Sequence, residues 1–450
     1  MKKIITYGTF DLFHEGHYNL LKRAKDLGDY LIVGVTTEQF DEYRGKINVI
    51  DSLMDRIEHI KQTGFADEII VEDHIGQKVE DIQKYGIDIF TVGSDWTGKF
   101  DYMKSYCEVV YLDRTKYISS TMLREKNREI IKLGIIGTGR IANRFVPEAK
   151  QVSGINAEAI YNPRLESAKK FGENFEIPYF DNWDLFIEKV TAVYIASPHD
   201  THYKYIKSAL NAGKHVLCEK PITLKKAHAE EVFALAKEKN LVLMEAIKTA
   251  YAPGFIKLLN IAKTGYIGDI YDVEACFTKL VYGDVRELKP DGISGSFTEL
   301  ASYPLLAVIK LLGIDYEDVR FESFYKNGVD IYTKSYLKYK NSIATVKVGL
   351  GVKSEGQLII SGLNGYIIVE APWWKTQSFE VRYEDISKNE KFFTKFRGEG
   401  LQYEINEFAA MIDRSAEKIS FKLTSEESIA IAGIMERFLE DKNSNKIIGR

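Results

Sequence analysis

From Lys2 to Leu112, short apolar runs alternate with stretches whose apolar residues recur at helical spacing. The runs are too short and too rich in β-branched residues to be buried helices, so they predict buried strands. These predicted strands cover residues 4–7, 31–35, 68–71, 87–92 and 109–112. Strands separated by helices need crossover connections, which predicts a mostly parallel sheet with helices on both faces.

The same alternation starts again at Leu133 and changes near Ala250. Predicted strands of the second series are residues 133–136, 157–161, 192–197, 215–218 and 242–245. They predict a second parallel sheet. Later come alternating stretches at 269–279, 331–339, 342–348 and 357–360, and helical patterns at 403–414 and 425–439. Such long alternation favours an antiparallel sheet. Residues 121–132 are charged and lack Gly and Pro, which predicts a helix between the two parallel sheets.

Composition and charge narrow the class of protein. A chain of 450 residues is too long for one hydrophobic core, since domains usually contain roughly 100–200 residues. The formal net charge of −4 is spread without long blocks of one sign, which argues against nucleic acid or a membrane as a partner and favours small molecules. Cys107, Cys218 and Cys276 have no metal-ligand spacing, so we expect reduced thiols and a cytoplasmic location. No apolar run approaches the ~18 residues of a membrane span.

A chemically distinctive segment, GTFDLFHEGH, follows the first predicted strand. Ligands bind at the carboxyl ends of parallel strands, and Gly8 allows the backbone to approach one closely. His14 and His17 stand three apart at the start of the next helix, where unpaired N–H groups and the helix dipole favour an anion. This arrangement suits a nucleotide triphosphate. The alternative is that both histidines only cap the helix and pack.

Two further segments favour the nucleotide. RTKYISST lies at residues 114–121, and GSDWTGKFD lies at residues 93–101. With the histidine motif they resemble the signatures of the cytidylyltransferase family, most closely its glycerol-3-phosphate cytidylyltransferases, over nearly all of residues 1–125. The resemblance implies a Rossmann-like nucleotidyltransferase domain, assigned to residues 1–128, that uses CTP with Mg²⁺. The sequence shows no dedicated metal site.

The resemblance also implies a role for each matching residue. His14 and His17 would be catalytic, holding the triphosphate and stabilising charge on its α-phosphate during in-line attack. The nucleotide would be bound by Gly8, Thr9, Phe10, Asp11, Arg114, Ser119, Ser120 and Thr121. The substrate side would comprise Lys46, which needs a gap in the match, and Arg56, Asp95 and Trp96. Asp95 and Trp96 could equally be a turn-capping carboxylate and a core aromatic.

A glycine-rich turn, LGIIGTGRIA, follows the first strand of the second predicted sheet. Gly137, Gly139 and Ala142 have the G-x-G-x-x-A spacing which, between a strand and a helix, predicts a dinucleotide pyrophosphate site. An acidic residue at the end of the next strand would select NAD. The sequence there reads YNPR, with Asn162 and Arg164. The prediction therefore tilts slightly towards NADP and leaves NAD open.

The segments ASPHDTH, residues 196–202, and AGKHVLCEKPIT, residues 212–223, resemble the glucose-fructose oxidoreductase and inositol dehydrogenase family. The likeness extends over residues 131–440. It implies an NAD(P)-binding Rossmann domain at 131–248, and then an α/β domain with an open, mainly antiparallel sheet at 249–450. The cofactor would be bound by Gly137, Gly139, Arg140, Ile141, Asn162, Arg164, Ser197, Pro198, His202 and Glu219.

By the same resemblance Lys220 is the catalytic lysine, which donates to the substrate oxygen as the hydride moves. Tyr303 stands where the family has His or Tyr and would relay the proton, and Glu299 would contact the substrate. The segment SGSFTELASYP departs from the pattern G-G-x-x-x-D-x-G-x-H/Y, with Glu299 at the Asp and Ala301 at the second Gly. This departure leaves the substrate open. His199 would contact the nicotinamide or cap its turn.

The two halves together predict an α/β enzyme that makes a CDP-polyol. It would reduce a sugar phosphate to a polyol phosphate with NAD(P)H and join the product to CMP from CTP, for a cell-surface polymer such as teichoic acid or capsule. Both resembled families form dimers or larger assemblies, so we expect a homo-oligomer. Two alternatives stay open: a glycerol-3-phosphate cytidylyltransferase fused to an oxidoreductase for an unrelated sugar, or fused to a catalytically silent cofactor-binding module.

Overall fold

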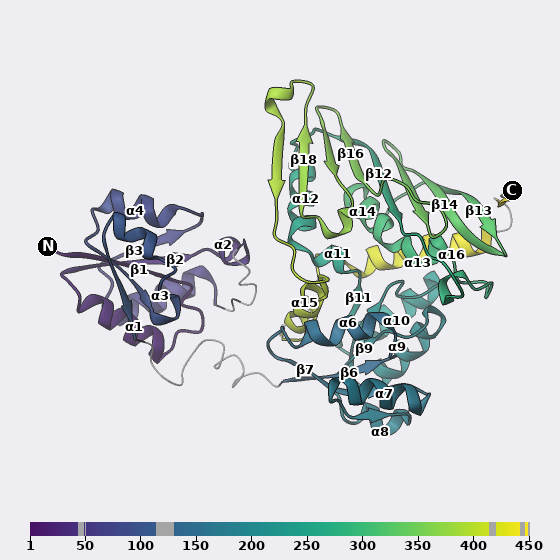
Figure 1. The fold of residues 1–450 in the computed structure, drawn as a ribbon, viewed down its shortest axis with the longest axis horizontal. Helices are drawn as coiled ribbons and strands as arrows, with labels where there is room; N and C mark the ends of the chain where they lie inside the picture. Colours follow the sequence, from purple (N-terminus) through teal and green to yellow (C-terminus); the bar gives the residue numbers. More distant parts are fainter. Residues whose placement is uncertain (44–48, 50, 114–129, 414–419, 442–445, 449–450) are drawn as a thin grey trace. The chain divides into compact units, whose positions relative to one another are not determined.

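The computed structural model describes residues 1–43, 49, 51–113, 130–413, 420–441 and 446–448 (Figure 1). The chain divides into two compact units, Met1–Glu129 and Ile130–Arg450. The first unit has one sheet, and the second has two. Within the described ranges, no helix is both long and apolar enough to cross a bilayer.

The first unit is built on a five-stranded parallel sheet in the order β3-β2-β1-β4-β5. Its elements are β1 (Lys3–Gly8), α1 (Glu15–Lys25), β2 (Tyr30–Thr36), α2 (Glu38–Tyr43), α3 (Leu53–Thr63), β3 (Glu68–Glu72), α4 (Gln77–Tyr85), β4 (Ile89–Gly93), the 3-10 turns η1 (Ser94–Trp96) and η2 (Asp101–Ser105), and β5 (Glu108–Leu112). Ile4 packs with Leu21 of α1, while Ile5 packs with Ile82 of α4. Helices therefore cover both faces, as the sequence predicts.

The second unit begins with a six-stranded parallel sheet in the order β11-β10-β9-β6-β7-β8. Its elements are β6 (Ile131–Ile136), α6 (Arg140–Ala149), β7 (Ile155–Tyr161), α7 (Leu165–Phe175), β8 (Tyr179–Phe180), α8 (Trp183–Ile187), β9 (Ala192–Ile195), η3 (His199–Thr201), α9 (His202–Asn211), β10 (His215–Glu219), α10 (Lys226–Glu238), β11 (Leu243–Ala246), α11 (Lys248–Tyr251) and α12 (Pro253–Lys263). The helix predicted to reach residue 132 is wrong at its end: Ile131 and Lys132 belong to β6, because they pair with β7. Most of that predicted helix lies outside the described residues.

A nine-stranded sheet follows, in the order β19-β18-β17-β16-β12-β15-β14-β13-β20. Its elements are β12 (Ile270–Thr278), η4 (Arg286–Leu288), α13 (Ser296–Leu300), α14 (Ser302–Leu312), β13 (Asp318–Lys326), β14 (Val329–Lys338), β15 (Ile343–Gly349), β16 (Leu358–Gly362), β17 (Tyr366–Val369), η5 (Trp373–Lys375), β18 (Ser378–Arg382), η6 (Ile386–Lys388), β19 (Glu390–Phe393), α15 (Leu401–Asp413), α16 (Ser425–Asp441) and β20 (Lys446–Ile448). Only the pairs β12–β15 and β13–β20 are parallel. The predicted α/β class with a mainly antiparallel last sheet is confirmed.

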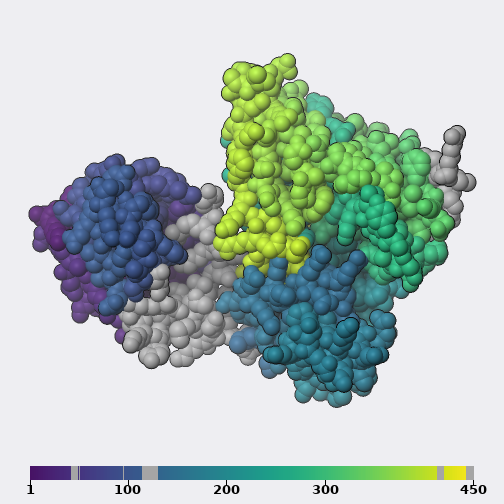
Figure 2. Space-filling model, in the orientation of Figure 1, coloured from purple at the N-terminus to yellow at the C-terminus, as the bar shows by residue number. Residues whose placement is uncertain are grey.

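The second unit contains two buried hydrophobic clusters, and the larger one includes residues of both sheets. Leu133 of the parallel sheet and Val346 of the antiparallel sheet belong to the same buried cluster, together with Phe408 of α15. Helix α15 packs against α6, and the space-filling view shows the yellow-green residues in direct contact with the blue ones (Figure 2). Residues on both sides of position 248 therefore share one buried cluster.

Candidate active sites

The two histidines of the first motif lie together just beyond β1. His14 caps α1, since its Nδ1 accepts a hydrogen bond from the backbone N–H of Gly16 at 3.0 Å. His17 follows one turn later, and the two imidazole rings stack with their centroids 3.9 Å apart. Because Nδ1 of His14 accepts, a neutral His14 carries its proton on Nε2. That nitrogen can donate to an anion at the start of the helix.

The turn between β1 and these histidines is tight. Phe10 and Leu12 have φ angles of 56° and 48°, in a region that non-glycine residues seldom enter. The buried Phe10 ring meets the His17 ring edge-on at 5.4 Å, and a Cβ added to Gly8 would lie 2.9 Å from the same phenyl ring. Backbone strain of this kind concentrates at ligand sites. The packing keeps the main chain of residues 8–10 close to the paired imidazoles.

Arg56 lies completely buried beneath this turn. Its Nη1 donates to the carbonyl oxygens of Thr9 and Thr36, at 2.9 and 2.8 Å, and its Nε donates to the Asp51 carbonyl at 3.0 Å. The Asp41 carboxylate accepts the hydroxyls of Thr9 and Thr36. The guanidinium therefore joins the ends of β1 and β2. Asp41 was missed in the sequence, where its only signal is an acidic residue in the short helix that directly follows a buried strand.

Other residues of the first predicted site have varied surroundings. Asp11 is buried and accepts the Asp51 backbone N–H at 2.9 Å. Trp96 is 46% exposed at the end of η1, with the Lys99 ammonium 4.8 Å from its ring centroid. Asp95 belongs to the same turn, directly after β4. Exposure at this edge of the sheet makes Trp96 available for stacking, which a core tryptophan would not be. Lys46, Arg114, Ser119, Ser120 and Thr121 lie outside the described residues.

The glycine turn of the second unit connects β6 to α6. Gly137 has a φ of 101°, and a Cβ there would lie 2.5 Å from the carbonyl oxygen of Ala196. Gly139 caps the helix in an extended conformation and has no heavy atom within 4 Å of the corresponding Cβ position. The conformation of the turn thus requires glycine at position 137. Beside Gly139, in contrast, there is open space. A helix start with open space before it suits a pyrophosphate.

Asn162 stands where an NAD-binding sheet would carry a carboxylate. Its Nδ2 donates to the Thr138 hydroxyl at 2.9 Å, and its Oδ1 accepts the Arg164 backbone N–H at 2.9 Å. The Asn162 side chain is buried, whereas Arg164 is exposed. The residue that follows β7, Asn162, therefore carries no negative charge, and the Arg164 guanidinium lies two residues further along the chain.

Lys220 brings the two oxidoreductase motifs together. It follows β10, and its Nζ donates to the Glu299 carbonyl oxygen at 2.7 Å. The same Nζ lies 6.0 Å from the centroid of the Tyr303 ring. The adjacent Glu219 is buried and accepts the Tyr194 hydroxyl at 2.6 Å, and burial raises the pKa of Glu219. Burial also raises the pKa of Tyr303 well above its ordinary value, so the phenol stays protonated.

Two histidines border this lysine. His202 is fully buried, with Nδ1 2.8 Å from the Pro221 carbonyl oxygen and Nε2 3.0 Å from that of Ser197. It therefore ties the predicted cofactor loop to the segment that follows Lys220. His199 lies 3.8 Å from Glu299, which also pairs with Arg286 at 2.7 Å. Burial lowers the pKa of His199 well below its usual value, so the ring is neutral.

Two charged residues missed by the sequence reasoning lie near Glu219. Glu404 of α15 is fully buried, and neither of its carboxylate oxygens has a hydrogen-bond partner. Burial raises its pKa well above the ordinary range, with Glu219 as the next cause, and burial lowers the pKa of Lys248. The only sequence signal was a charge at an otherwise apolar helical position, as in LQYEINEF.

Comparison with known proteins matches both halves of the chain. A "Cytidylyltransferase-like" family model covers residues 5–126, and an "Oxidoreductase family, NAD-binding Rossmann fold" model covers residues 131–247. The glycerol-3-phosphate cytidylyltransferase of Bacillus spizizenii is 51% identical over 125 residues, which span 28% of this chain and 96% of that protein.

Relatives of the second unit cover nearly its whole length. The scyllo-inositol 2-dehydrogenase (NADP(+)) of Bacillus subtilis is 28% identical over 318 residues, covering 68% of this chain and 95% of that protein. A crystal structure of a 3-ketoreductase from Actinomadura kijaniata, in complex with TDP-benzene and NADP, matches with a TM-score of 0.59 and 26% identity, over 68% of this chain and 96% of that one.

The two folds and their strand-end sites define a fused enzyme with a nucleotidyltransferase domain and a dehydrogenase domain. Helices on both faces of a parallel sheet, with polar groups at the strand ends, are the shared framework. The chain belongs to the cytidylyltransferase family through its first unit, and its second unit is an NAD(P)-dependent oxidoreductase of the glucose-fructose oxidoreductase and inositol dehydrogenase family.

Proposed function

We propose that the chain synthesises a CDP-polyol in two consecutive reactions. In the first, a hydride from NADPH and a proton add to the carbonyl group of a sugar phosphate, which gives a polyol phosphate and NADP⁺. In the second, a phosphate oxygen of that product attacks the α-phosphorus of CTP, and pyrophosphate leaves. The observation that carries the proposal is that a cytidylyltransferase domain 51% identical to one named for a polyol phosphate shares its chain with an oxidoreductase domain.

For the transfer step, the paired imidazoles provide the main support. His14 and His17 would donate hydrogen bonds to the phosphate oxygens where negative charge develops, which is the chief requirement of in-line phosphoryl chemistry. The substrate phosphate is already ionised, so no general base is needed. In the described part of the chain no three metal-binding side chains gather into a group. We therefore propose Mg²⁺ only as a companion of the triphosphate and assign it no protein ligands.

For the reduction, the glycine turn fits a dinucleotide, since a Cβ at Gly137 would fill the closely packed turn and the space beside Gly139 is open. We propose NADP as the cofactor, because Asn162 brings no carboxylate to repel a 2′-phosphate and Arg164 offers a cation. The cofactor supplies the hydride. Lys220, held by the Glu299 carbonyl, would donate a hydrogen bond to the substrate oxygen, and Tyr303 would relay the proton.

The test assays the purified full chain in two separate reactions. NADPH oxidation is followed with a panel of three- to six-carbon sugar phosphates, and pyrophosphate release from CTP is followed with the corresponding polyol phosphates. His17→Ala should abolish only the second reaction and Lys220→Ala only the first. If no sugar phosphate is reduced, or if the reduced product never accepts CMP, the consecutive scheme is wrong.

A second function has specific support. The matching 3-ketoreductase structure holds a TDP derivative, so the second unit could act on a nucleotide-linked sugar that is unrelated to the cytidylyl acceptor. In that case NADPH oxidation would require a nucleotide-linked ketosugar, and Lys220→Ala would abolish it. A third possibility, a silent cofactor-binding module, predicts NADPH binding without oxidation of NADPH by any member of either panel.

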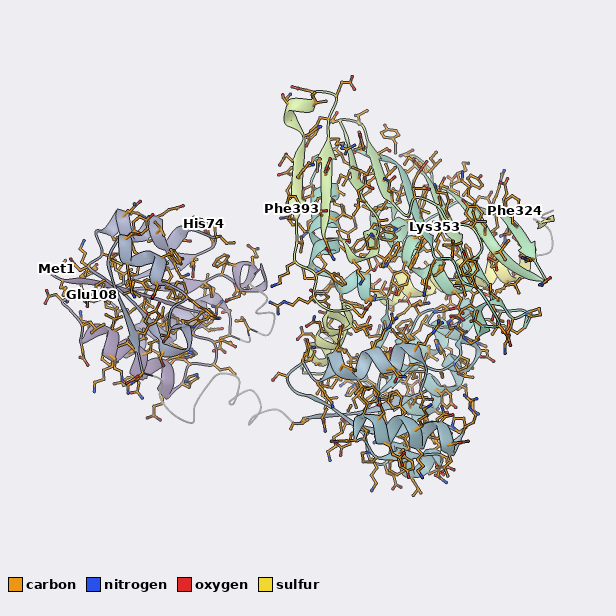
Figure 3. All side chains as sticks on the ribbon, in the orientation of Figure 1. Met1, His74, Glu108, Phe324, Lys353 and Phe393 are labelled. Atoms are coloured by element: carbon orange, nitrogen blue, oxygen red, sulfur yellow. The ribbon has the colours of Figure 1, made fainter. Side chains whose placement is uncertain are left out.

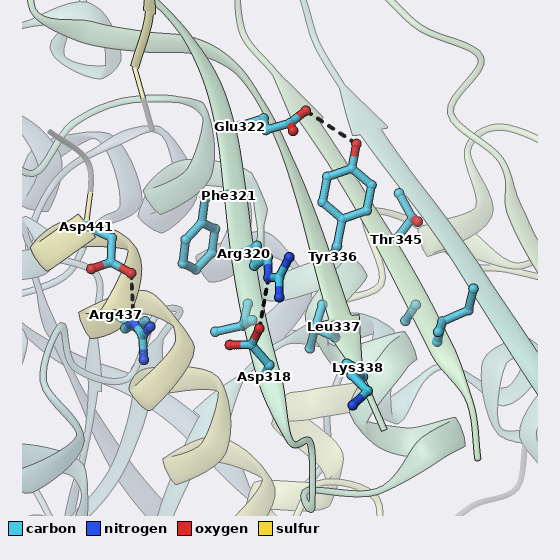
Figure 4. A pocket seen from close by; sticks show the side chains of 13 residues that line it. Asp318, Arg320, Phe321, Glu322, Tyr336, Leu337, Lys338, Thr345, Arg437 and Asp441 are labelled. Carbon is cyan, nitrogen blue, oxygen red and sulfur yellow. Dashed lines mark hydrogen bonds and ion pairs between the residues drawn. The ribbon is translucent and has the colours of Figure 1, made fainter. Parts of the chain in front are cut away.

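We also propose that copies of the chain associate through the outer face of the nine-stranded sheet. A groove there is lined by β13, β14 and β15 together with Arg437 and Asp441 of α16 (Figure 4). Within it Asp318 bonds to Arg320, and Glu322 bonds to Tyr336. Phe324, 39% exposed, extends this face towards the edge of the sheet (Figure 3). A two-fold contact needs a self-complementary surface, and both charge signs beside aromatic rings provide one. Light scattering should give a multiple of the 51.4 kDa chain mass, and a monomer mass would contradict the proposal.

A further inference from the structure

Three cations converge on the carboxylate of Glu399. The Oε2 atom of Glu399 lies 3.8 Å from Lys248 Nζ, 3.7 Å from Lys375 Nζ and 3.9 Å from Arg144 Nη1. All three separations exceed the usual hydrogen-bond range of about 2.7–3.2 Å. Three positively charged groups therefore surround the single Glu399 carboxylate, and none of them lies within hydrogen-bond range of its Oε2 atom.

The Glu399 backbone is fixed, whereas its side chain is held only by these long ion pairs. Its backbone N–H donates to Glu148, and its carbonyl oxygen accepts Lys248 Nζ at 2.6 Å. The flanking Gly398 and Gly400 both have positive φ, 54° and 84°. The carboxylate is 41% exposed. It can rotate towards solvent without moving the backbone, and Lys248 keeps its hydrogen bond to the carbonyl when this happens.

An aromatic wall connects this cation cluster to the catalytic tyrosine. The Phe277 ring lies 5.3 Å from the ring of Tyr303 and stacks on Trp374 at 3.7 Å. Trp374 adjoins Lys375, and its carbonyl oxygen accepts the Thr249 hydroxyl at 2.7 Å, next to Lys248. These stacked rings therefore connect the ring of Tyr303, the residue proposed to relay the proton, with Lys248 and Lys375. Rings of this kind commonly line the apolar side of a sugar.

Burial disfavours the charged forms of two nearby acids. Burial raises the pKa of Glu219 and of Glu404, which favours their uncharged forms. Lys248 has only 12% of its side chain exposed and Lys375 has 28%. Burial lowers the pKa of Lys248, and an anion placed beside its ammonium group would stabilise the charged form. Partly buried ammonium groups with an incompletely bonded counter-ion favour a multiply charged anion.

We propose that Lys248 and Lys375 bind the phosphate group of the oxidoreductase's substrate, and that Glu399 occupies this subsite until the phosphate displaces it. The inference rests on the proposed function, because it explains how the second unit recognises a phosphorylated sugar. A phosphate dianion offers three oxygens, enough to contact both ammonium groups and still accept a hydrogen bond from Arg144. The same anion chemistry could come from the cofactor pyrophosphate, and the test separates the two sources.

The first arm measures binding without turnover. Inorganic phosphate is titrated by calorimetry into the full chain saturated with NADP⁺, which fills the cofactor's own phosphate sites. Lys375→Ala and Lys248→Met should each weaken phosphate binding by about tenfold, while Glu399→Gln should strengthen it by roughly two- to fivefold, because the internal competitor loses its charge. Lys388→Ala serves as the matched control, since this lysine is 70% exposed and paired with Asp385. It should bind phosphate like the parent chain.

The second arm measures kinetics with each sugar phosphate beside its unphosphorylated sugar. Lys375→Ala should raise KM about tenfold for the phosphorylated sugar and leave KM for NADPH unchanged. If KM for NADPH rises instead, the cations serve the cofactor and the proposal is overturned. Equal losses with both sugars, or weaker phosphate binding in Glu399→Gln, also overturn it. Phosphate binding that follows the expected pattern without reduction of any sugar phosphate would support this subsite and refute the consecutive scheme.

Discussion

The two candidate active sites both lie at the carboxyl ends of parallel strands, but they are assembled differently. In the first unit, His14 and His17 come from a single turn and stack on each other at 3.9 Å. In the second, Lys220 meets the Glu299 carbonyl across 79 positions of the chain. Helix geometry alone can bring together residues that are close in sequence, such as His14 and His17. Lys220 and Glu299 meet only because the antiparallel-sheet half packs against the Rossmann half. The local site should therefore tolerate changes elsewhere better than the composite one.

The largest effect should come from removing the ammonium group of the composite site. Lys220→Ala should lower the rate of NADPH oxidation by about 10³-fold, because the substrate oxygen loses its hydrogen-bond donor in the transition state. Stopped-flow absorbance of NADPH measures the step. Pyrophosphate release from CTP serves as the internal control and should stay unchanged. A parallel loss of both activities would show that the two sites are not independent.

Next in size is the buried guanidinium under the histidine turn. Arg56→Met should lower the free energy of unfolding of the first unit by about 3–5 kcal/mol, since the carbonyls of Thr9 and Thr36 and the Asp41 carboxylate lose their cation. Chemical denaturation followed by circular dichroism would measure this. Arg23→Met, a change at an arginine bonded to an exposed carbonyl, is the matched control and should cost under about 1 kcal/mol. Similar losses in both variants would contradict the buried role of Arg56.

A smaller effect distinguishes the two glycines of the second unit. Gly137→Ala places a Cβ 2.5 Å from the Ala196 carbonyl oxygen at a φ of 101°. It should destabilise the second unit by about 2–3 kcal/mol and weaken NADP⁺ binding. Gly139→Ala meets no atom and should leave stability within about 1 kcal/mol of the parent. Thermal unfolding with and without NADP⁺ tests the pair, and equal stability of both variants would contradict the described turn.

The smallest expected effect depends on pH. Burial raises the pKa of Glu245 to about 7, while its Oε1 accepts the Ile222 backbone N–H at 2.8 Å, two residues after Lys220. The folded state therefore binds this proton more tightly than the unfolded state does. Glu245 should cost about 2 kcal/mol of stability as pH rises from about 5 to 7, and the loss should be complete above the folded pKa. Glu245→Gln keeps the acceptor and should flatten this pH dependence. An unchanged slope in denaturation curves would contradict the assignment.

The sequence predicted the elements better than the contacts between them. Strand runs and helix periods in the two parallel sheets identified the framework, because each signal is local. The antiparallel sheet was recognised as a type, but β13 and the strands β17–β19 were missed. Strands β17, β18 and β19 have only four or five residues each, which leaves little alternation to recognise. Strand β13 has nine residues, so its length does not explain why it was missed. Lys248 and Glu404 were missed because burial of a charge is a property of the folded structure. The burial of Arg56 was equally invisible from spacing.

The central claim is that the product of the composite site is the substrate of the local one. The most direct measurement supplies the full chain with CTP, a sugar phosphate and NADPH that carries deuterium at the transferred position. If the two reactions are consecutive, the CDP-polyol will be one deuterium heavier than the product made with ordinary NADPH, and Lys220→Ala will give no labelled product. A deuterated polyol phosphate that never appears in a CDP-linked product would contradict the coupling of the two sites.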